Sequence, residues 1–394
     1  MLKIFDIEQL KEGMFVDSIA KQQGKINITS RGLVTSYAAI EQLKKKGILS
    51  VVVDMSKSLG FEDVEQQPKT LEITPKISNE VSFEVELEVA TKLHAEGKHL
   101  QKNILNSVSK NLPIDIAIPE AFTNNLVSSI SRNPNALMCM TKIREKDNYL
   151  LEHSLNVAIL LATFATHVGL KEAQVQELAL SGFLHDVGKI KIPSKILDKP
   201  GLLDDQEMTI MRDHVYFSTK FLLEMGISEA IVLTISQHRE RLDGYGYPGG
   251  LRGDEIKQFG RMIAIVDTYD AITADRCYKA SVTSKKALQI LLQEAPEKYD
   301  QKLVSQFVQC IGIFPAGSLV KLSNEKIALV IKQHPLNSAN PVVKIFYSVQ
   351  DKQYLEPKEL NLATASNGVK IVEAVIASDF KLDFNKYFNE SIVI

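Results

Sequence analysis

Side chains that can bind a metal ion recur along the middle of this sequence. Five of its eight histidines fall between residues 153 and 238, and His185 is followed directly by Asp186. Four of these histidines and one further aspartate lie three, four or seven positions from an apolar residue of the same segment. On a helix, each would therefore lie on the inward face. The residues with this spacing are His153, His185, His214, His238 and Asp267.

Burying these groups separately in an apolar core would be unfavourable, because an unpaired buried polar group destabilises the fold. Around divalent cations the same groups are useful, since each imidazole supplies one ligand atom and a carboxylate can bridge two ions. A single inward histidine is more often a hydrogen-bonded core residue than a ligand. We interpret His94, His99 and His334 in that way, and His167 as a helix-end or surface residue.

A pair of cations would suit the hydrolysis of a phosphodiester. Two ions about 3.5–4 Å apart lower the pKa of a water molecule between them and neutralise the charge that develops on phosphorus oxygens. Lys189 follows Asp186 by three residues. A helix that continued through this segment would place its ammonium group beside the ions, either on a substrate phosphate or in an ion pair with Asp186 or Asp267.

The elements that must position these residues are predicted to be mainly helical. We expect a mainly α protein with a small mixed α/β domain at residues 1–57 and a linker and helical connector at 58–135. The helical domain with the candidate ligands would follow at 136–312, and a small β-rich extension at 313–394. The charged helical pattern near residues 80–110 is compatible with a homodimer.

Local signals mark several of these elements. A helix is expected over residues 37–46 and strands at 49–53, 318–321, 327–332 and 342–347. Asp204 with Glu207 forms the pattern of a capping box, and Ser228 is expected to cap the next helix. The glycine-rich segment 243–253 cannot be helical.

The composition is that of an ordinary globular protein. The 394 residues are 45% hydrophobic and 24% charged, and the formal net charge is −2. A nucleic acid is therefore not expected as a partner. The three cysteines form no Cys-x-x-Cys pair, which fits a reducing compartment. The N-terminus lacks a signal-peptide pattern, and the longest apolar stretch, residues 157–165, predicts a core helix rather than a membrane span. We expect a cytoplasmic protein without membrane insertion.

Two motifs make the chain resemble a known family. Residues 185–189 read His-Asp-Val-Gly-Lys, which matches the HDxGK signature of the HD phosphohydrolase superfamily. Residues 243–248 read Asp-Gly-Tyr-Gly-Tyr-Pro, which is similar to the DGxGYP signature of the HD-GYP family. The resemblance extends over about residues 140–310. Residues 10–16, Leu-Lys-Glu-Gly-Met-Phe-Val, are similar to the opening of a domain often found ahead of HD-GYP domains.

The resemblance implies a helical bundle that hydrolyses the bacterial second messenger cyclic di-GMP to the linear dinucleotide pGpG, and in some members to GMP. It implies two or three metal ions, commonly iron or manganese. Asp186 would bridge two of them, and Lys189 would act with His185 and Asp186 in catalysis. The metal ligands that the motifs imply are His153, His185, Asp186, His214, His238 and Asp267.

The resemblance also implies substrate contacts outside the metal ligands. Tyr247 would contact the substrate or orient the fold, and its loop would be a docking site for a protein partner. Arg276 and Lys279 would contact phosphate or base. The alternative for both cations is a solvated basic surface.

Two positions depart from the family pattern. Arg239 stands where the family usually has a second histidine, and Tyr149 stands where three-metal members have a glutamate. An arginine is cationic at any accessible pH and would repel a third cation, so we predict a two-metal site. Alternatively, Arg239 points away from the site and pairs with a carboxylate such as Glu240.

Two other functions stay open at this stage. One is a catalytically weak sensor or scaffold that binds a cyclic dinucleotide in the same pocket, which Arg239 favours. The other is hydrolysis of a different nucleotide, which the DGxGYP-like loop disfavours.

Overall fold

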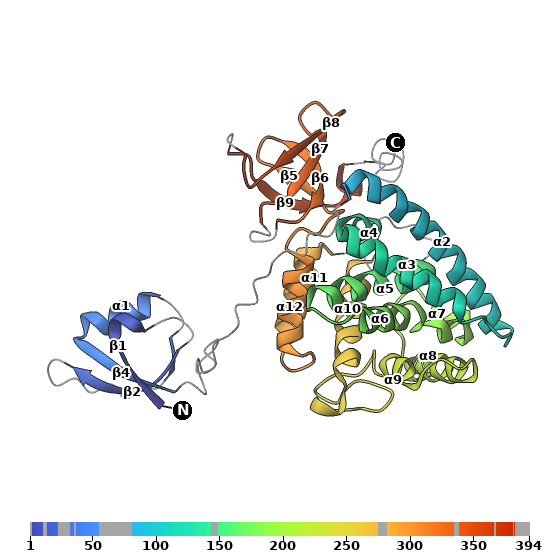
Figure 1. The fold of residues 1–394 in the computed structure, drawn as a ribbon, viewed down its shortest axis with the longest axis horizontal. Coiled ribbons are helices and arrows are strands. Elements are labelled where there is room, and N and C mark those ends of the chain that lie inside the picture. The colour runs from blue at the N-terminus through green and yellow to red at the C-terminus, as the bar shows by residue number, and fades with distance from the viewer. Residues whose placement is uncertain are drawn as a thin grey trace. The chain divides into compact units, whose positions relative to one another are not determined.

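The computed structural model describes most of the chain as two compact units, residues 1–77 and 78–394 (Figure 1). The described residues are 2–10, 14–22, 32–34, 37–54, 81–142, 149–274, 282–334, 339–365, 368–380 and 382. None of the helices among them is long and apolar enough to cross a bilayer.

The first unit is a small antiparallel sheet with one helix. The strands β1 (Leu2–Asp6), β2 (Phe15–Gln22), β3 (Gly32–Leu33) and β4 (Ile48–Asp54) lie in the order β1-β4-β2-β3. A short 3₁₀ helix, η1 (Ile7–Gln9), follows β1, and helix α1 (Tyr37–Lys45) precedes β4. Val51 and Val53 point from β4 into a core that also contains Ile40 of α1. The helix predicted over residues 37–46 and the strand predicted at 49–53 are therefore confirmed.

The second unit is mainly helical and holds the candidate ligands. Its α-helices are α2 (Phe83–Ser109), α3 (Ala117–Arg132), α4 (Pro134–Met140), α5 (Tyr149–His167), α6 (Glu172–Leu184), α7 (Ser194–Leu197), α8 (Asp205–Glu224), α9 (Glu229–Ser236), α10 (Gln258–Thr273), α11 (Ser284–Glu294) and α12 (Gln301–Ile311). The 3₁₀ helices η4 (Val187–Lys191) and η5 (Gly253–Glu255) lie between them, and η6 (Ala377–Phe380) lies near the C-terminus.

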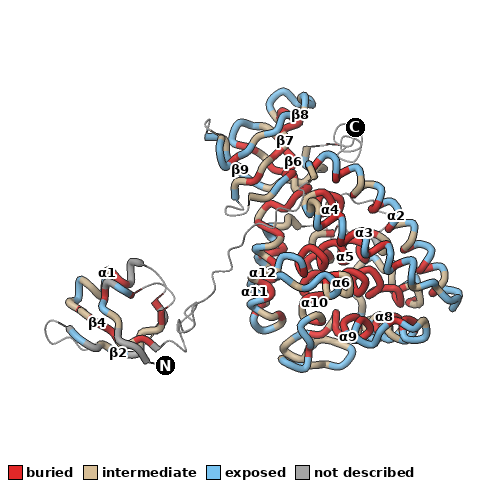
Figure 2. Tube along the Cα trace, in the orientation of Figure 1, coloured by how far each residue is buried: buried red, intermediate tan, exposed pale blue. Residues whose placement is uncertain are grey.

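Helix α5 forms the centre of this unit. Its segment from Leu155 to Leu161 is almost completely buried, as the colouring of Figure 2 shows, because most of its side chains are apolar and the helix packs against α2, α3, α6 and α10. The prediction of a core helix over residues 157–165 is confirmed. Helices α2 and α3 also contribute buried residues to this core, among them Leu87 and Leu126. The predicted domain boundaries stay predictions.

Local signals in the sequence identified several helix starts. The Asp204 side chain accepts a hydrogen bond from the Glu207 backbone at 2.9 Å, and the Glu207 carboxylate accepts one from the Asp204 backbone at the same distance. This is the predicted capping box at the start of α8. Ser228 caps α9 through Ile231, also as predicted.

The C-terminal part is a five-stranded antiparallel sheet in the order β8-β7-β6-β5-β9. Its strands are β5 (Leu319–Leu322), β6 (Lys326–Lys332), β7 (Val342–Ser348), β8 (Gln353–Asn361) and β9 (Ile371–Val375). The three predicted strands correspond to β5, β6 and β7. Strand β6 buries both faces, because Leu329 joins the helical core while Ala328 and Val330 belong to a separate core of the sheet.

Candidate metal centre

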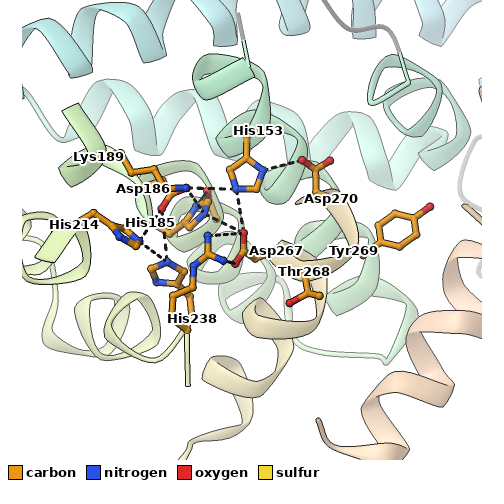
Figure 3. A network of polar contacts seen from close by, with 12 residues as sticks. His153, His185, Asp186, Lys189, His214, His238, Asp267, Thr268, Tyr269 and Asp270 are labelled. Carbon is orange, nitrogen blue, oxygen red and sulfur yellow. Dashed lines mark hydrogen bonds and ion pairs between the residues drawn. The ribbon is translucent and has the colours of Figure 1, made fainter. Parts of the chain in front are cut away.

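Side chains from five helical segments converge on one buried cluster (Figure 3). His153 lies in α5, His214 in α8 and Asp267 in α10, whereas the remaining residues follow helix ends. His185 and Asp186 come directly after α6, and His238 comes two residues after the end of α9. All of these side chains are buried. The structure thus brings together every residue that the sequence analysis proposed as a metal ligand: His153, His185, Asp186, His214, His238 and Asp267.

The ligand-type atoms fall into two groups that share Asp186. In the first, which we call position A, Asp186 Oδ2 lies 3.4 Å from His153 Nε2 and 3.2 Å from His185 Nε2. Asp267 Oδ1 lies 3.0 Å and 3.8 Å from the same two nitrogens. Two ligands bonded to one cation at about 2.1 Å lie roughly 3–3.5 Å apart, so this spacing suits a shared ion.

The second group, position B, consists of Asp186, His214 and His238. Asp186 Oδ1 lies 3.4 Å from His214 Nε2 and 3.6 Å from His238 Nε2, and the two nitrogens lie 3.4 Å from each other. Asp186 therefore presents one carboxylate oxygen to each position, which is the arrangement expected of a bridging ligand.

Hydrogen bonds on the far side of each ring fix which nitrogen faces the cluster. The Nδ1 atoms of His185, His214 and His238 lie 2.8, 2.6 and 2.6 Å from the backbone carbonyl oxygens three residues earlier. A carbonyl oxygen can only accept, so each Nδ1 carries the hydrogen and donates it. The neutral ring then directs the lone pair of Nε2 into the cluster, as metal binding requires.

Asp270 plays the corresponding part for His153, and the sequence analysis did not single it out. Its Oδ2 lies 2.8 Å from His153 Nδ1. Asp270 follows Asp267 by three residues, so both carboxylates project from one face of α10, whereas the Tyr269 ring points away (Figure 3). This spacing is visible in the sequence and could have identified Asp270.

Buried polar atoms that lack a hydrogen-bond partner indicate whether a cation fits the cluster. His185 Nε2 and Asp186 Oδ1 are buried, and no hydrogen bond from the described residues reaches either atom. Such atoms are rare in folded proteins unless water or an ion completes them. The residues present therefore fit a divalent cation, and iron, manganese and zinc all accept imidazole and carboxylate ligands.

The charges in the cluster also favour cation binding. Burial lowers the pKa of His238 to about 4 and that of His214 well below its ordinary value, so both rings are neutral near pH 7. For Asp186 and Asp267 burial acts upward on the pKa, but nearby positive groups outweigh it and hold both pKa values well below the usual range. His185 is the exception, because against the lowering effect of burial Asp186 raises its pKa, and a cation bound there would have to displace a proton from the ring.

Lys189 reaches the cluster by a different backbone path from the one predicted. Helix α6 ends at Leu184, and the chain continues as the 3₁₀ helix η4 rather than as an α-helix. The Lys189 ammonium nevertheless forms an ion pair with Asp186 Oδ2. Gly188 makes this path feasible, because a Cβ there would lie 2.3 Å from the carbonyl oxygen of His214.

Arg239 faces the cluster. Its Nη1 lies 3.0 Å from Asp267 Oδ2, so the alternative in which Arg239 points away is wrong. The Glu240 carboxylate instead accepts hydrogen bonds from the backbone of Gly249 at 2.6 Å and of Leu251 at 2.9 Å. Glu240 thereby holds the glycine-rich loop in place.

The loop over residues 243–253 is irregular, as predicted, and is closed by a single bridge between Asp243 and Arg252. The Tyr247 ring lies edge-on to His214 with 6.1 Å between ring centroids, and the Arg212 guanidinium lies 5.2 Å from the centre of the Tyr247 ring. Tyr247 is therefore at the margin of position B.

Three residues named in the sequence analysis cannot be placed in this site. Arg276 and Lys279 lie outside the described residues. Tyr149 begins α5, but its side chain is not among those described. Their roles stay predictions.

Comparison with known proteins agrees with this geometry. A family model described as HD domain matches residues 137–303, and one described as a domain of unknown function (DUF3391) matches residues 2–118. The cyclic di-GMP phosphodiesterase PA4108 of Pseudomonas aeruginosa is 32% identical over 381 residues, which are 94% of this chain and 92% of that protein.

Other relatives match shorter parts of the chain. The cyclic di-GMP phosphodiesterase of Thermotoga maritima is 27% identical over 285 residues, or 70% of each protein. The 3′3′-cGAMP-specific phosphodiesterase 2 of Vibrio cholerae is 36% identical over 162 residues, which are 40% of this chain and 30% of that protein. The chain belongs to the HD-GYP family of HD domain proteins.

Proposed function

We propose that this protein is a phosphodiesterase with two divalent metal ions that hydrolyses cyclic di-GMP to pGpG. The observation that carries the proposal is the pair of ligand groups that share Asp186, one at position A and one at position B. The relative from Pseudomonas aeruginosa, which aligns with nearly the whole of this chain, is a cyclic di-GMP phosphodiesterase, and this supports the proposed substrate.

In this proposal His153, His185, Asp186 and Asp267 hold one cation, and Asp186, His214 and His238 hold the other. Bound at these positions, the cations would activate water near neutral pH and neutralise charge on the phosphodiester. Water attacks phosphorus in line with the ribose 3′-oxygen, so that a new P–O bond forms as the P–O3′ bond breaks. The departing oxygen receives a proton from solvent, and the attacking water releases one of its protons to solvent in exchange.

The remaining residues bind and orient the substrate. Lys189 is held against Asp186 and can donate to a phosphate oxygen when the substrate arrives. Tyr247, at the margin of position B, forms a wall against which the substrate lies. Arg276 and Lys279 are proposed as further contacts to phosphate or base.

We propose two rather than three metal ions, with pGpG as the product. The Arg239 guanidinium on Asp267 is a fixed positive charge at the edge of position A, and it disfavours a third cation there. Iron or manganese is the proposed metal. The homodimer, a protein partner at residues 243–253 and a cytoplasmic location stay predictions from the sequence.

Incubation of the manganese- or iron-loaded protein with cyclic di-GMP, prepared without oxygen, tests the proposal. We expect pGpG as the product on chromatography, with no product from the variant in which His185 and Asp186 are both alanine. Tight binding without product would support a sensor instead. A parallel incubation with 3′3′-cGAMP tests the substrate named for the Vibrio cholerae relative, and faster turnover of 3′3′-cGAMP would overturn the assignment of cyclic di-GMP.

A further inference from the structure

The two positions are not equivalent in the groups that surround them. Position A gathers four ligand-type atoms, from His153, His185, Asp186 and Asp267. Position B gathers three, from Asp186, His214 and His238. A cation at position A would thus have one more protein ligand, and that extra ligand is a carboxylate.

The hydrogen-bond acceptors of the histidine Nδ1 atoms also differ between the two positions, and they too favour position A. The Nδ1 atoms of His214 and His238 donate to backbone carbonyls, which are neutral. His153 Nδ1 instead lies 2.8 Å from the buried carboxylate of Asp270 (Figure 3). A carboxylate behind a histidine ligand fixes its tautomer and orientation and makes the ring a stronger ligand.

Two positively charged side chains contact ligands of position A. Arg239 Nη1 lies 3.0 Å from Asp267 Oδ2, and Arg239 Nη2 lies 3.4 Å from Asp267 Oδ1, the atom that also faces His153 and His185. Lys189 contacts Asp186 Oδ2, the carboxylate oxygen that faces position A. Position A therefore has three carboxylates, from Asp186, Asp267 and Asp270, against these two cations, and Asp270 is the carboxylate that lies behind a histidine ligand.

We propose that Asp270 is a positioning residue that acts through His153 and makes position A the tighter of the two metal positions. This inference rests on the proposed two-metal function and adds an order of release to it: the ion at position B leaves first and the ion at position A is retained. Asp270 contacts neither metal nor substrate in this assignment.

Graded dialysis against a chelator, followed by measurement of protein-bound manganese, tests the proposal without using activity. The wild-type protein should lose its two ions in two separate steps. In Asp270→Asn the second ion should be lost at a free chelator concentration about 10–100-fold lower than in the wild type. The concentration that removes the first ion should stay unchanged. The amide oxygen of Asn can still accept from His153 Nδ1, so this variant removes the charge and keeps the hydrogen bond. Asp270→Ala, which removes both, should shift the second step further.

Two control variants complete the experiment. His238→Ala should abolish the first step and leave the second, which assigns the steps to the two positions. Asp300→Asn removes a carboxylate that pairs with Arg261 and caps α12, and it should leave both steps unchanged. Thermal melting of the metal-free variants separates a loss of affinity from a loss of folding. If Asp270→Ala does not fold, Asp270→Asn carries the test.

The outcomes distinguish the inference from the function on which it rests. Two steps in the wild type that Asp270→Asn leaves unchanged would overturn the role of Asp270, as would a shift of the first step only. Failure of the wild-type protein to bind any manganese or iron would overturn the proposed function itself.

Discussion

Position A and position B share Asp186 but are built on different parts of the helical unit. Position A takes its other ligands from α5, the end of α6 and α10, which form the centre of the core. Position B takes them from α8 and the end of α9, which expose apolar residues such as Tyr216 and Leu233 on their outer faces. A ligand at position A is therefore fixed by packing on all sides. The ligands of position B are equally buried, but the helices that carry them have one face exposed to solvent.

The largest effect on metal content and turnover is expected from replacing Asp186, which both positions share, together with its neighbour His185. Replacing His185 and Asp186 together by alanine removes one ligand of position A and the group shared by both. We expect loss of both metal ions and a fall in turnover of more than about 10³-fold, because the charge-stabilising groups of the reaction are lost. The far-ultraviolet circular dichroism should stay helical, since the core around α5 is untouched. Activity retained in this variant would refute the site.

Removal of a single ligand of position B should separate the two positions. His238→Ala is expected to reduce the metal content from two ions to one and to lower turnover by roughly 10²–10³-fold, as loss of one charge-stabilising group does. His153→Ala is the matched variant for position A and should release the ion that His238→Ala retains. Metal analysis after gel filtration measures both. Equal loss of both ions in His238→Ala would show that the two positions do not bind independently.

The ligands could be predicted from the sequence because each one is recognisable by two independent features. His153 and His214 have both a ligand chemistry and an inward position on a regular helix, and the helical period makes that position visible. Lys189 was expected on a continued α-helix. The change to a 3₁₀ helix depends on how Gly188 packs against α8, which is a contact between segments and leaves no local pattern.

Elsewhere in the fold, too, elements could be predicted only where the sequence carries a local pattern. Strand β6 was visible as an apolar run because it buries both faces. Strand β8 was not predicted, because most of its residues are exposed or only partly buried at one edge of the sheet and Pro357 interrupts its pattern. The partner of Arg239 could not be chosen from sequence either, since Glu240 and Asp267 were both available and only the fold assigns Glu240 to the loop.

A smaller effect is expected where α8 packs against η4. A Cβ at residue 188 would lie 2.3 Å from His214 O and 2.4 Å from Ser218 N, and both are backbone atoms that cannot move aside cheaply. We expect Gly188→Ala to reduce the free energy of unfolding by about 1–3 kcal/mol through overpacking. It should also weaken metal binding at position B more than at position A. Gly32→Ala is a matched control, since a Cβ there meets nothing within 4 Å, and it should leave the melting temperature of the second unit unchanged.

The smallest effect concerns the charge beside position A. Burial acts to raise the pKa of Asp267, and Arg239 is the largest of the groups that hold it well below the usual value. Arg239→Gln keeps a polar side chain and removes the charge, so the pKa of Asp267 should rise. The ionised form that binds a cation exists above that pKa, and metal binding is lost as the pH falls through it. The acidic limit of manganese binding should therefore move to higher pH in Arg239→Gln, with little change above neutrality.

Arg239→His, alone or with Tyr149→Glu, tests whether the charge of Arg239 or the lack of a ligand at this position limits the metal content, because histidine can itself bind a metal ion. If the charge of Arg239 alone excludes a third cation, metal content should rise above two ions in Arg239→Gln as well as in the histidine variants. A rise only in the histidine variants would show that the third ion also needs the additional ligand, and a constant content would show that the charge serves Asp267 alone.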